Sequence, residues 1–105
     1  MIYKVQARYI EDKAGEFFQK LTDGTIASQQ PDGAEIVSSM NKAKIVGEGK
    51  IEWFETCYCD TPLKHERETV YNFYLTDITT DLVDAKGKIK GESFWDYLQE
   101  NKGPF

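Results

Sequence analysis

The feature that most constrains the fold is a strict alternation of apolar and polar residues near the start of the chain, over Ile2–Ile10. Successive side chains of a β-strand point to opposite faces of a sheet, so this alternation predicts a strand with one buried face. Such a strand is stable only within a larger sheet whose apolar face is covered by a further layer. The apolar face carries Tyr3, Val5, Ala7 and Tyr9, and the polar face carries Lys4, Gln6 and Arg8.

Helices and strands alternate along the rest of the chain. Apolar residues at helical spacing predict a helix over 12–22 that begins at Asp12. The stretch 50–59 is rich in β-branched and aromatic residues and predicts the strongest strand. A second long helix is expected to begin at Asp60-Thr61-Pro62, with Pro62 in its first turn, and to run to Leu75. The other expected elements are a short helix over 33–40, strands over 43–46 and 78–83, an edge pairing at Ile89, and a helix over 93–100 opened by a capping box at Ser93.

This order of elements predicts a single α+β domain over residues 1–105. It resembles the ferredoxin-like arrangement, in which an antiparallel sheet carries two helices on one face, here with a short C-terminal helix added. Which face is covered stays open, because both faces of 50–59 carry large apolar groups. The layout also resembles the small dimeric α/β-barrel proteins, which include cofactor-independent monooxygenases. That resemblance covers the element order and the stretch from Ala7 to Leu21, and it implies no catalytic residue.

Charge and hydropathy exclude several classes of function. The chain has 13 basic and 18 acidic residues and a net charge of −5, so it repels phosphate backbones, and nucleic acid is not an expected partner. No apolar run approaches the ~18 residues that a membrane span requires, so no membrane partner is expected. The first residues lack the apolar core of a signal peptide, which makes the cytoplasm the expected location.

One group of residues predicts a pocket between the helix over 60–75 and the sheet. Helical spacing puts Glu66 and Arg67 near the apolar line of that helix, and Glu55 shares a strand face with Trp53. Charged groups there must pair, so Glu55 and Arg67 are expected to form an ion pair, either at the edge of the core or as the polar floor of an aromatic pocket. The candidate ligand-binding residues are Trp53, Glu55, Glu66, Arg67, Tyr71 and Tyr74.

Metal and thiol chemistry receive little support from the sequence. His65 is the only histidine, and helical spacing turns it away from the apolar line, toward solvent. Its cluster with Cys57, Cys59 and Glu66 lacks the paired spacing of zinc sites, so no metal is expected. The two cysteines are expected to be thiols without a mutual disulfide, since neighbours on one face of a strand fit disulfide geometry poorly.

Two Asp-Gly pairs, Asp23-Gly24 and Asp32-Gly33, fall in the loop region between the first two expected helices. Turn chemistry explains both pairs. A metal-binding role would need further carboxylates to converge on them.

The outer face of the sheet is expected to be mixed in character. Phe54 and Tyr58 are costly to leave exposed, so a homodimer formed through this face is predicted. Lys4 and Arg8 are expected either to pair with Glu52 across the sheet or to hold an anionic ligand at the dimer interface.

No P-loop, dinucleotide fingerprint or zincin helix is present, and no cofactor is expected. The leading hypothesis is therefore a small ligand-binding or protein-interaction module that acts as a homodimer. Its expected partners are a second copy of the chain and either a small apolar ligand or a protein. The alternative is a small cofactor-independent enzyme of the dimeric α/β-barrel type that acts on an apolar or aromatic substrate.

Overall fold

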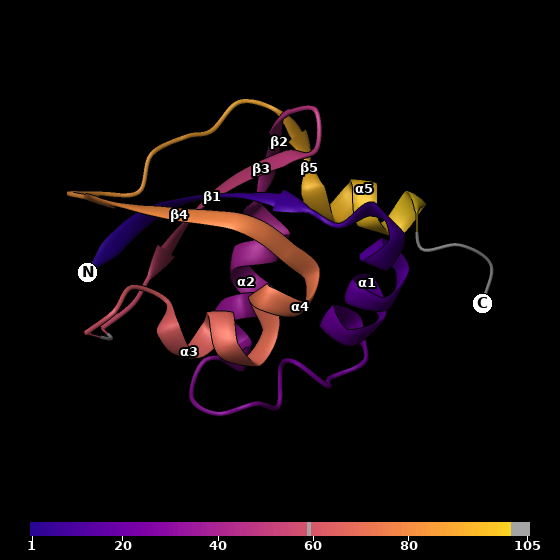
Figure 1. Ribbon diagram of the computed structural model, residues 1–105, viewed down its shortest axis with the longest axis horizontal. Helices are drawn as coiled ribbons and strands as arrows, with labels where there is room; N and C mark the ends of the chain where they lie inside the picture. Colours follow the sequence, from indigo (N-terminus) through magenta and orange to yellow (C-terminus); the bar gives the residue numbers. More distant parts are fainter. Residues whose placement is uncertain (59, 102–105) are drawn as a thin grey trace.

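A five-stranded antiparallel sheet forms the centre of the molecule, with the strands in the order β4-β1-β3-β2-β5 (Figure 1). The structure is a computed structural model and describes residues 1–58 and 60–101. With helices packed on the sheet the fold is α+β, as the sequence predicts. The strands are β1 (Ile2–Tyr9), β2 (Lys44–Gly47), β3 (Lys50–Thr56), β4 (Leu75–Val83) and β5 (Glu92–Ser93).

The pairing of β1 with β3 decides which face of the sheet is buried. Val5 lies opposite Trp53, and Tyr3 lies opposite Glu55. All four side chains are at most 8% exposed and belong to, or lie among, the residues of one core. The alternation in β1 therefore has the predicted effect. The sequence did not settle which face the helices cover, and the covered face is the one that carries Trp53 and Glu55.

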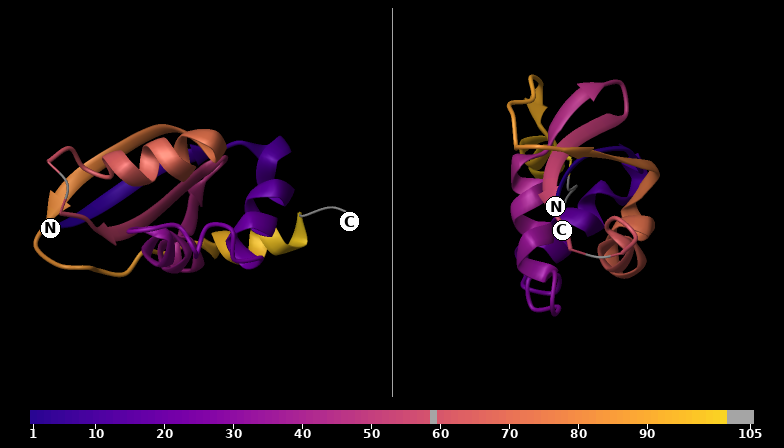
Figure 2. Two further views of the ribbon diagram at one scale, coloured as in Figure 1. Left: turned by 90° about the horizontal axis from the view of Figure 1, so that it is seen from below. Right: turned by 90° about the vertical axis from the view of Figure 1, so that its left-hand side faces the viewer.

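Four helical bodies surround that core in the described part of the chain. They are α1 (Ala14–Thr22), preceded by the 3-10 turn Glu11–Lys13; α2 (Gly33–Lys42); a helical segment over 64–74; and α5 (Phe94–Glu100). Figure 1 shows α2 and the segment 64–74 beneath the sheet and α1 at its right-hand end. Seen from the helix side, α2 and the segment 64–74 flank the strands (Figure 2, left).

The helical segment 64–74 departs from the sequence expectation in two ways. It begins at Lys64 rather than at Asp60–Pro62, because Leu63 has a left-handed backbone with φ of 56° and interrupts the chain there. It also consists of α3 (Lys64–Glu66), a π-helical turn (Arg67–Tyr71) and α4 (Asn72–Tyr74). A π-helical turn holds more residues than an α-helical one, so side-chain directions counted at regular helical spacing fail in this segment.

The chain after β4 crosses the outer face of the sheet. In Figure 1 this stretch, residues 84–91, passes on the side away from the helices. It runs over Phe54 so closely that a β-carbon at Gly87 would lie 3.6 Å from the Phe54 ring. Gly91, with φ of +152°, then brings the backbone against Ile45, and the edge pairing forms at Glu92–Ser93 rather than at the expected Ile89.

The start of α5 confirms the Ser93 cap, one half of the capping box predicted from the sequence. The backbone N–H of Asp96 donates to Oγ of Ser93 at 3.2 Å. The buried residues Phe94 and Leu98 then carry the helix into the core, where it packs against α1 and α2. The cap therefore fixes where the last helix joins the fold.

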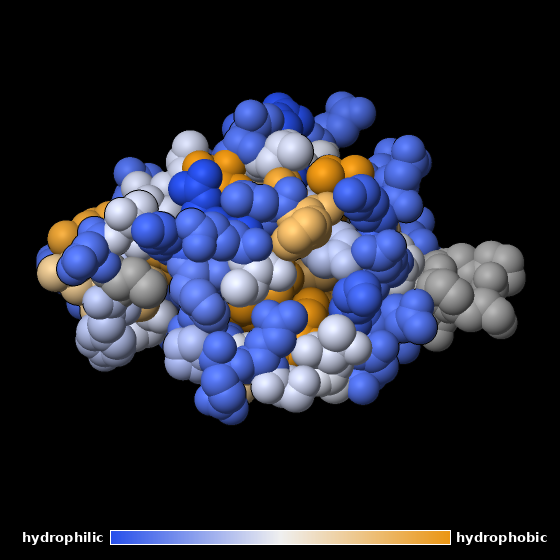
Figure 3. Space-filling view, turned by 60° about the horizontal axis from the view of Figure 1, so that its bottom comes forward, coloured by the Kyte–Doolittle hydropathy of each residue, from blue (hydrophilic) through white to orange (hydrophobic). Residues whose placement is uncertain are grey.

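Seen from the side of the helices, the surface is mostly hydrophilic, and apolar atoms show only in small separate areas (Figure 3). Among the described residues, none of the helices has the length and apolar character needed to cross a membrane.

Candidate functional site

The outer face of the sheet contains the ion pair that the sequence predicts. Nζ of Lys4 lies 2.8 Å from Oε1 of Glu52, and the Gln6 side-chain amide donates to Oε2 of Glu52 at 3.0 Å. Glu52 is only 7% exposed, so these two neighbours satisfy a nearly buried carboxylate. Arg8 lies apart, 3.9 Å from the carboxylate of Asp77.

Beside this pair, a groove opens between the outer face and the stretch 84–91. It has a volume of about 460 Å³. Half-buried Phe54 and Ile89 supply its apolar surface, and four lysines supply charge. We call it the lysine groove; it is lined by Lys42, Lys44, Phe54, Lys86, Gly87, Lys88 and Ile89.

Distant parts of the chain build the lysine groove. Lys42 comes from the last turn of α2, Lys44 from β2 and Phe54 from β3. Lys86 and Lys88 arrive with the crossing segment, which Gly91 anchors at the sheet edge. Within the residues that the structure describes, no carboxylate forms an ion pair with any of the four lysines. The groove is therefore a positively charged recess on a chain of net charge −5.

The residues predicted as a pocket lie mostly inside the core. Trp53, Glu55, Glu66 and Tyr71 are each at most 1% exposed, and their side chains meet. Oε1 of Glu55 accepts hydrogen bonds from Nε1 of Trp53 at 2.8 Å and from the Tyr71 hydroxyl at 2.6 Å. The structure thus assembles a buried polar cluster at this place and closes it from solvent.

Burial dominates the electrostatics of this cluster. Desolvation raises the pKa of Glu55 to about 8, although the hydrogen bonds from Tyr71 and Trp53 act in the opposite direction. Burial also raises the pKa of Tyr71, and the neighbouring Glu55 adds to that increase. Oε2 of Glu55 and Oε1 of Glu66 are buried without a donor among the described residues. A proton on Glu55 that is donated to Glu66 satisfies both of these oxygens, because a protonated carboxyl is a donor.

The other two predicted pocket residues stand away from this cluster. Arg67 lines a surface hollow with Lys64 and Glu68, and the expected Glu55–Arg67 ion pair does not form in the described structure. The irregular start and π-helical turn of the segment 64–74 point Glu66, rather than Arg67, at the sheet. Tyr74 donates to Oε2 of Glu16 at 2.5 Å and borders a second hollow of about 310 Å³.

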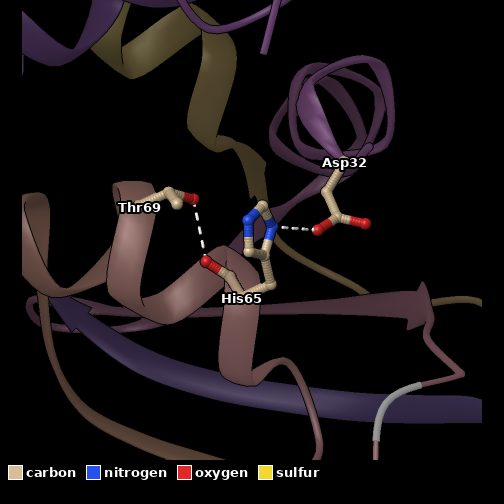
Figure 4. Close-up of polar contacts among 3 residues, drawn as sticks. All are labelled: Asp32, His65 and Thr69. Atoms are coloured by element: carbon tan, nitrogen blue, oxygen red, sulfur yellow. Dashed lines mark hydrogen bonds and ion pairs between the residues drawn. The ribbon is translucent and has the colours of Figure 1, made fainter. Parts of the chain in front are cut away.

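His65 has a partner that the sequence did not indicate. Its ring is turned toward Asp32, whose carboxylate can only accept, so Nδ1 of His65 donates to Oδ2 at 2.5 Å (Figure 4). The backbone carbonyl of His65 accepts from the Thr69 hydroxyl at 2.8 Å. His65 is thus partly exposed, as the sequence predicts, but it also has an unpredicted partner, because a loop residue far along the chain reaches it.

Two sets of residues escape the sequence analysis. The lysines of the groove have no periodic pattern, because they come from two separated stretches, 42–44 and 86–88. The sequence predicts only a turn at Asp32, from the pair Asp32-Gly33, and nothing near it in the sequence connects it with His65. Cys57 is buried, while Cys59 lies outside the described residues, so the predictions of two thiols without a disulfide and without zinc remain predictions.

Comparison of the chain with family models, with curated proteins and with solved structures finds no match.

Proposed function

We propose that this protein is a ligand-binding module whose lysine groove takes a small anionic molecule with an apolar portion. The observation that carries the proposal is the set of four lysines around a half-buried aromatic ring, none of which has an ion-pair partner among the described residues. The anionic group is a carboxylate, sulfonate or phosphate held by lysine ammonium groups. The apolar portion packs on Phe54 and Ile89.

Size and charge both support this proposal. A volume of about 460 Å³ lies within the ~300–1,000 Å³ typical of small-molecule sites. Elsewhere the acidic surface repels anions, so a local excess of positive charge directs an anion to the groove. The lysine ammonium is a compact point charge, whereas the arginine guanidinium is a planar fork of donors. Four lysines therefore suit recognition of negative charge more than recognition of one planar group.

The test uses 8-anilinonaphthalene-1-sulfonate, an aromatic anion whose fluorescence rises in apolar surroundings. The variant Lys42→Gln/Lys88→Gln removes two charges from the groove. The matched control Lys50→Gln/Lys64→Gln removes two charges from exposed lysines that do not line it. Both variants change the net charge equally, so general electrostatics cancel in the comparison.

We expect saturable binding to the unmodified chain that weakens as salt is added. The groove variant should bind about tenfold more weakly, since each exposed ion contact contributes about 0.5–1 kcal/mol. Equal weakening in the control variant would contradict the proposal. So would equal binding of neutral N-phenyl-1-naphthylamine, which keeps the rings and lacks the sulfonate.

Fold type and assembly belong to the same proposal. We infer a ferredoxin-like arrangement, supported by the strand order β4-β1-β3-β2 and by helices between β1 and β2 and between β3 and β4.

We also infer a homodimer: Tyr58 is 87% exposed and Leu82 is 63% exposed, and both lie where β3 and β4 end beside the start of β1. Phe54 is partly covered by the chain's own crossing segment and contributes less than expected. Light scattering that returns only monomer would remove the dimer, and imaging of a tagged chain tests the cytoplasmic location.

One observation favours a second candidate, the cofactor-independent enzyme. Glu55 bears a proton near neutral pH and lies beside a π-helical turn, a feature frequent at functional sites. Because Trp53 and Tyr71 are also fully buried, an apolar substrate reaches Glu55 only if the segment 64–74 moves away from the sheet. Amide hydrogen exchange as slow in this segment as in β1 would exclude such an opening.

A further inference from the structure

We propose that Asp32, His65 and Glu66 bind a first-row divalent transition-metal ion such as Zn²⁺ or Co²⁺. This site lies on the helix side of the molecule and does not depend on the lysine groove. The residues come from two parts of the chain: Asp32 directly precedes α2, and the other two residues belong to α3.

The geometry of the three side chains suits a common ion. One ligand atom from each residue lies within 4.8 Å of the ligand atoms of the other two. Two ligands bound at about 2.0–2.1 Å in a tetrahedron stand about 3.3 Å apart. Side-chain rotations therefore bring all three onto one ion, and the ion replaces the proton between His65 and Asp32.

Glu66 supplies an observation that points to a cation independently of this clustering. Its side chain is 1% exposed, and among the described residues its Oε1 has no donor except a proton shared with Glu55, whose place a bound cation takes. It also touches the carboxyl of Glu55, so two acids are buried together. No lysine or arginine in the described structure forms an ion pair with either acid. Buried carboxylates of this kind are normally compensated by a proton, by a paired charge or by a metal ion.

The surroundings hold the ligands in place. A β-carbon at Gly33 would lie 2.1 Å from the carbonyl oxygen of Ile26, so only glycine lets the loop pack this closely beside Asp32. The Thr69 hydroxyl donates to the backbone of His65 (Figure 4). Glu55, itself held by Tyr71, contacts Glu66. Supporting contacts of this kind orient metal ligands and raise affinity.

Ligand type and access define the class of ion. The side chains of Asp32 and His65 are 24% and 42% exposed, so an ion enters from solvent and keeps a position for water. One imidazole with two carboxylates suits Zn²⁺, Co²⁺ or Mn²⁺, whereas Mg²⁺ and Ca²⁺ prefer sites built from oxygen alone.

The experiment titrates the EDTA-treated and dialysed chain with Zn²⁺ by calorimetry and with Co²⁺ by absorbance. We expect one ion per chain and a higher melting temperature with the ion bound. Asp32→Asn and His65→Gln should each weaken binding at least about tenfold. The matched control Glu68→Gln alters an exposed acid of the same helical segment outside the cluster and should bind as the unmodified chain does.

Because Asp32 and His65 are partly exposed, both variants are expected to fold, and circular dichroism checks this. Absence of stoichiometric binding would overturn the proposal. So would unchanged affinity in His65→Gln, or equal loss in Glu68→Gln. A thiolate-to-cobalt charge-transfer band, or loss of binding in Cys59→Ser, would assign the ion to cysteine and overturn the proposal as well.

Discussion

Replacing Glu55 by Gln should make the protein more stable at pH 8 and remove much of its pH dependence between about pH 5 and pH 8. The pKa of Glu55 is raised by burial from 4.5 to about 8 in the folded chain. The folded state therefore holds a proton that the unfolded state has lost in this interval. The stability that this proton contributes is complete below the unfolded pKa, and it disappears as the pH rises through the folded pKa.

The magnitude follows from the size of the pKa shift. One bound proton changes the free energy of unfolding by up to about 1.4 kcal/mol per pH unit. Between pH 5 and pH 8 the loss is about 2–4 kcal/mol, because this interval covers most of the rise in the Glu55 pKa from 4.5 to about 8. A Gln side chain has the shape of the protonated acid. Its carbonyl accepts from Trp53 and Tyr71, and its amide donates to Glu66, so the variant avoids this loss.

The assay is urea unfolding followed by tryptophan fluorescence at several pH values, with EDTA present so that metal binding does not contribute. The difference between Glu55→Gln and the unmodified chain cancels the contributions of groups that the substitution leaves unchanged. Glu68→Gln, at an exposed acid, should change neither stability nor slope. Parallel pH profiles for Glu55→Gln and the unmodified chain would refute the reasoning, because Glu55 would then titrate alike in both states.

Other predictions follow from local contacts. Gly33→Ala should cost about 2–4 kcal/mol in unfolding free energy, since its β-carbon would lie 2.1 Å from the carbonyl oxygen of Ile26. A β-carbon at Gly47 would meet nothing within 4 Å, so Gly47→Ala should change stability by less than about 0.5 kcal/mol. Equal effects of the two substitutions in urea unfolding would contradict this packing. Ser93→Ala should cost about 1 kcal/mol through loss of the cap of α5, and a melting temperature equal to that of the unmodified chain would show that the cap is dispensable.

The sequence predicts features that depend on local pattern. Alternation in β1, the helix cap at Ser93 and the apolar spacing of α1 depend on neighbours within one turn or one strand, and the structure contains all three. The gathering of Trp53, Glu55 and Tyr71 was also predictable, because strand and helix periodicity turned them toward one core. The Lys4–Glu52 pair followed from the alternation of two strands that are neighbours in the sheet.

Features that depend on distant or irregular segments were not predictable in this way. The left-handed Leu63 and the π-helical turn have no sequence signal in regular spacing, so Glu66 rather than Arg67 meets Glu55. The approach of Asp32 to His65 depends on the path of a long loop. The lysine groove requires the crossing of 84–91 over the sheet, which only the tertiary structure reveals.

The most direct test of the lysine groove as the ligand site maps the binding of 8-anilinonaphthalene-1-sulfonate by amide chemical shifts in two-dimensional NMR. We predict that the largest shifts occur at Lys44, Phe54 and the stretch 86–89, which line the groove. The competing location is the hollow of about 310 Å³ on the helix side, lined by Ile26, Val70 and Phe73. Shifts centred there, with no shift of the groove amides, would show that the lysine groove is not the ligand site.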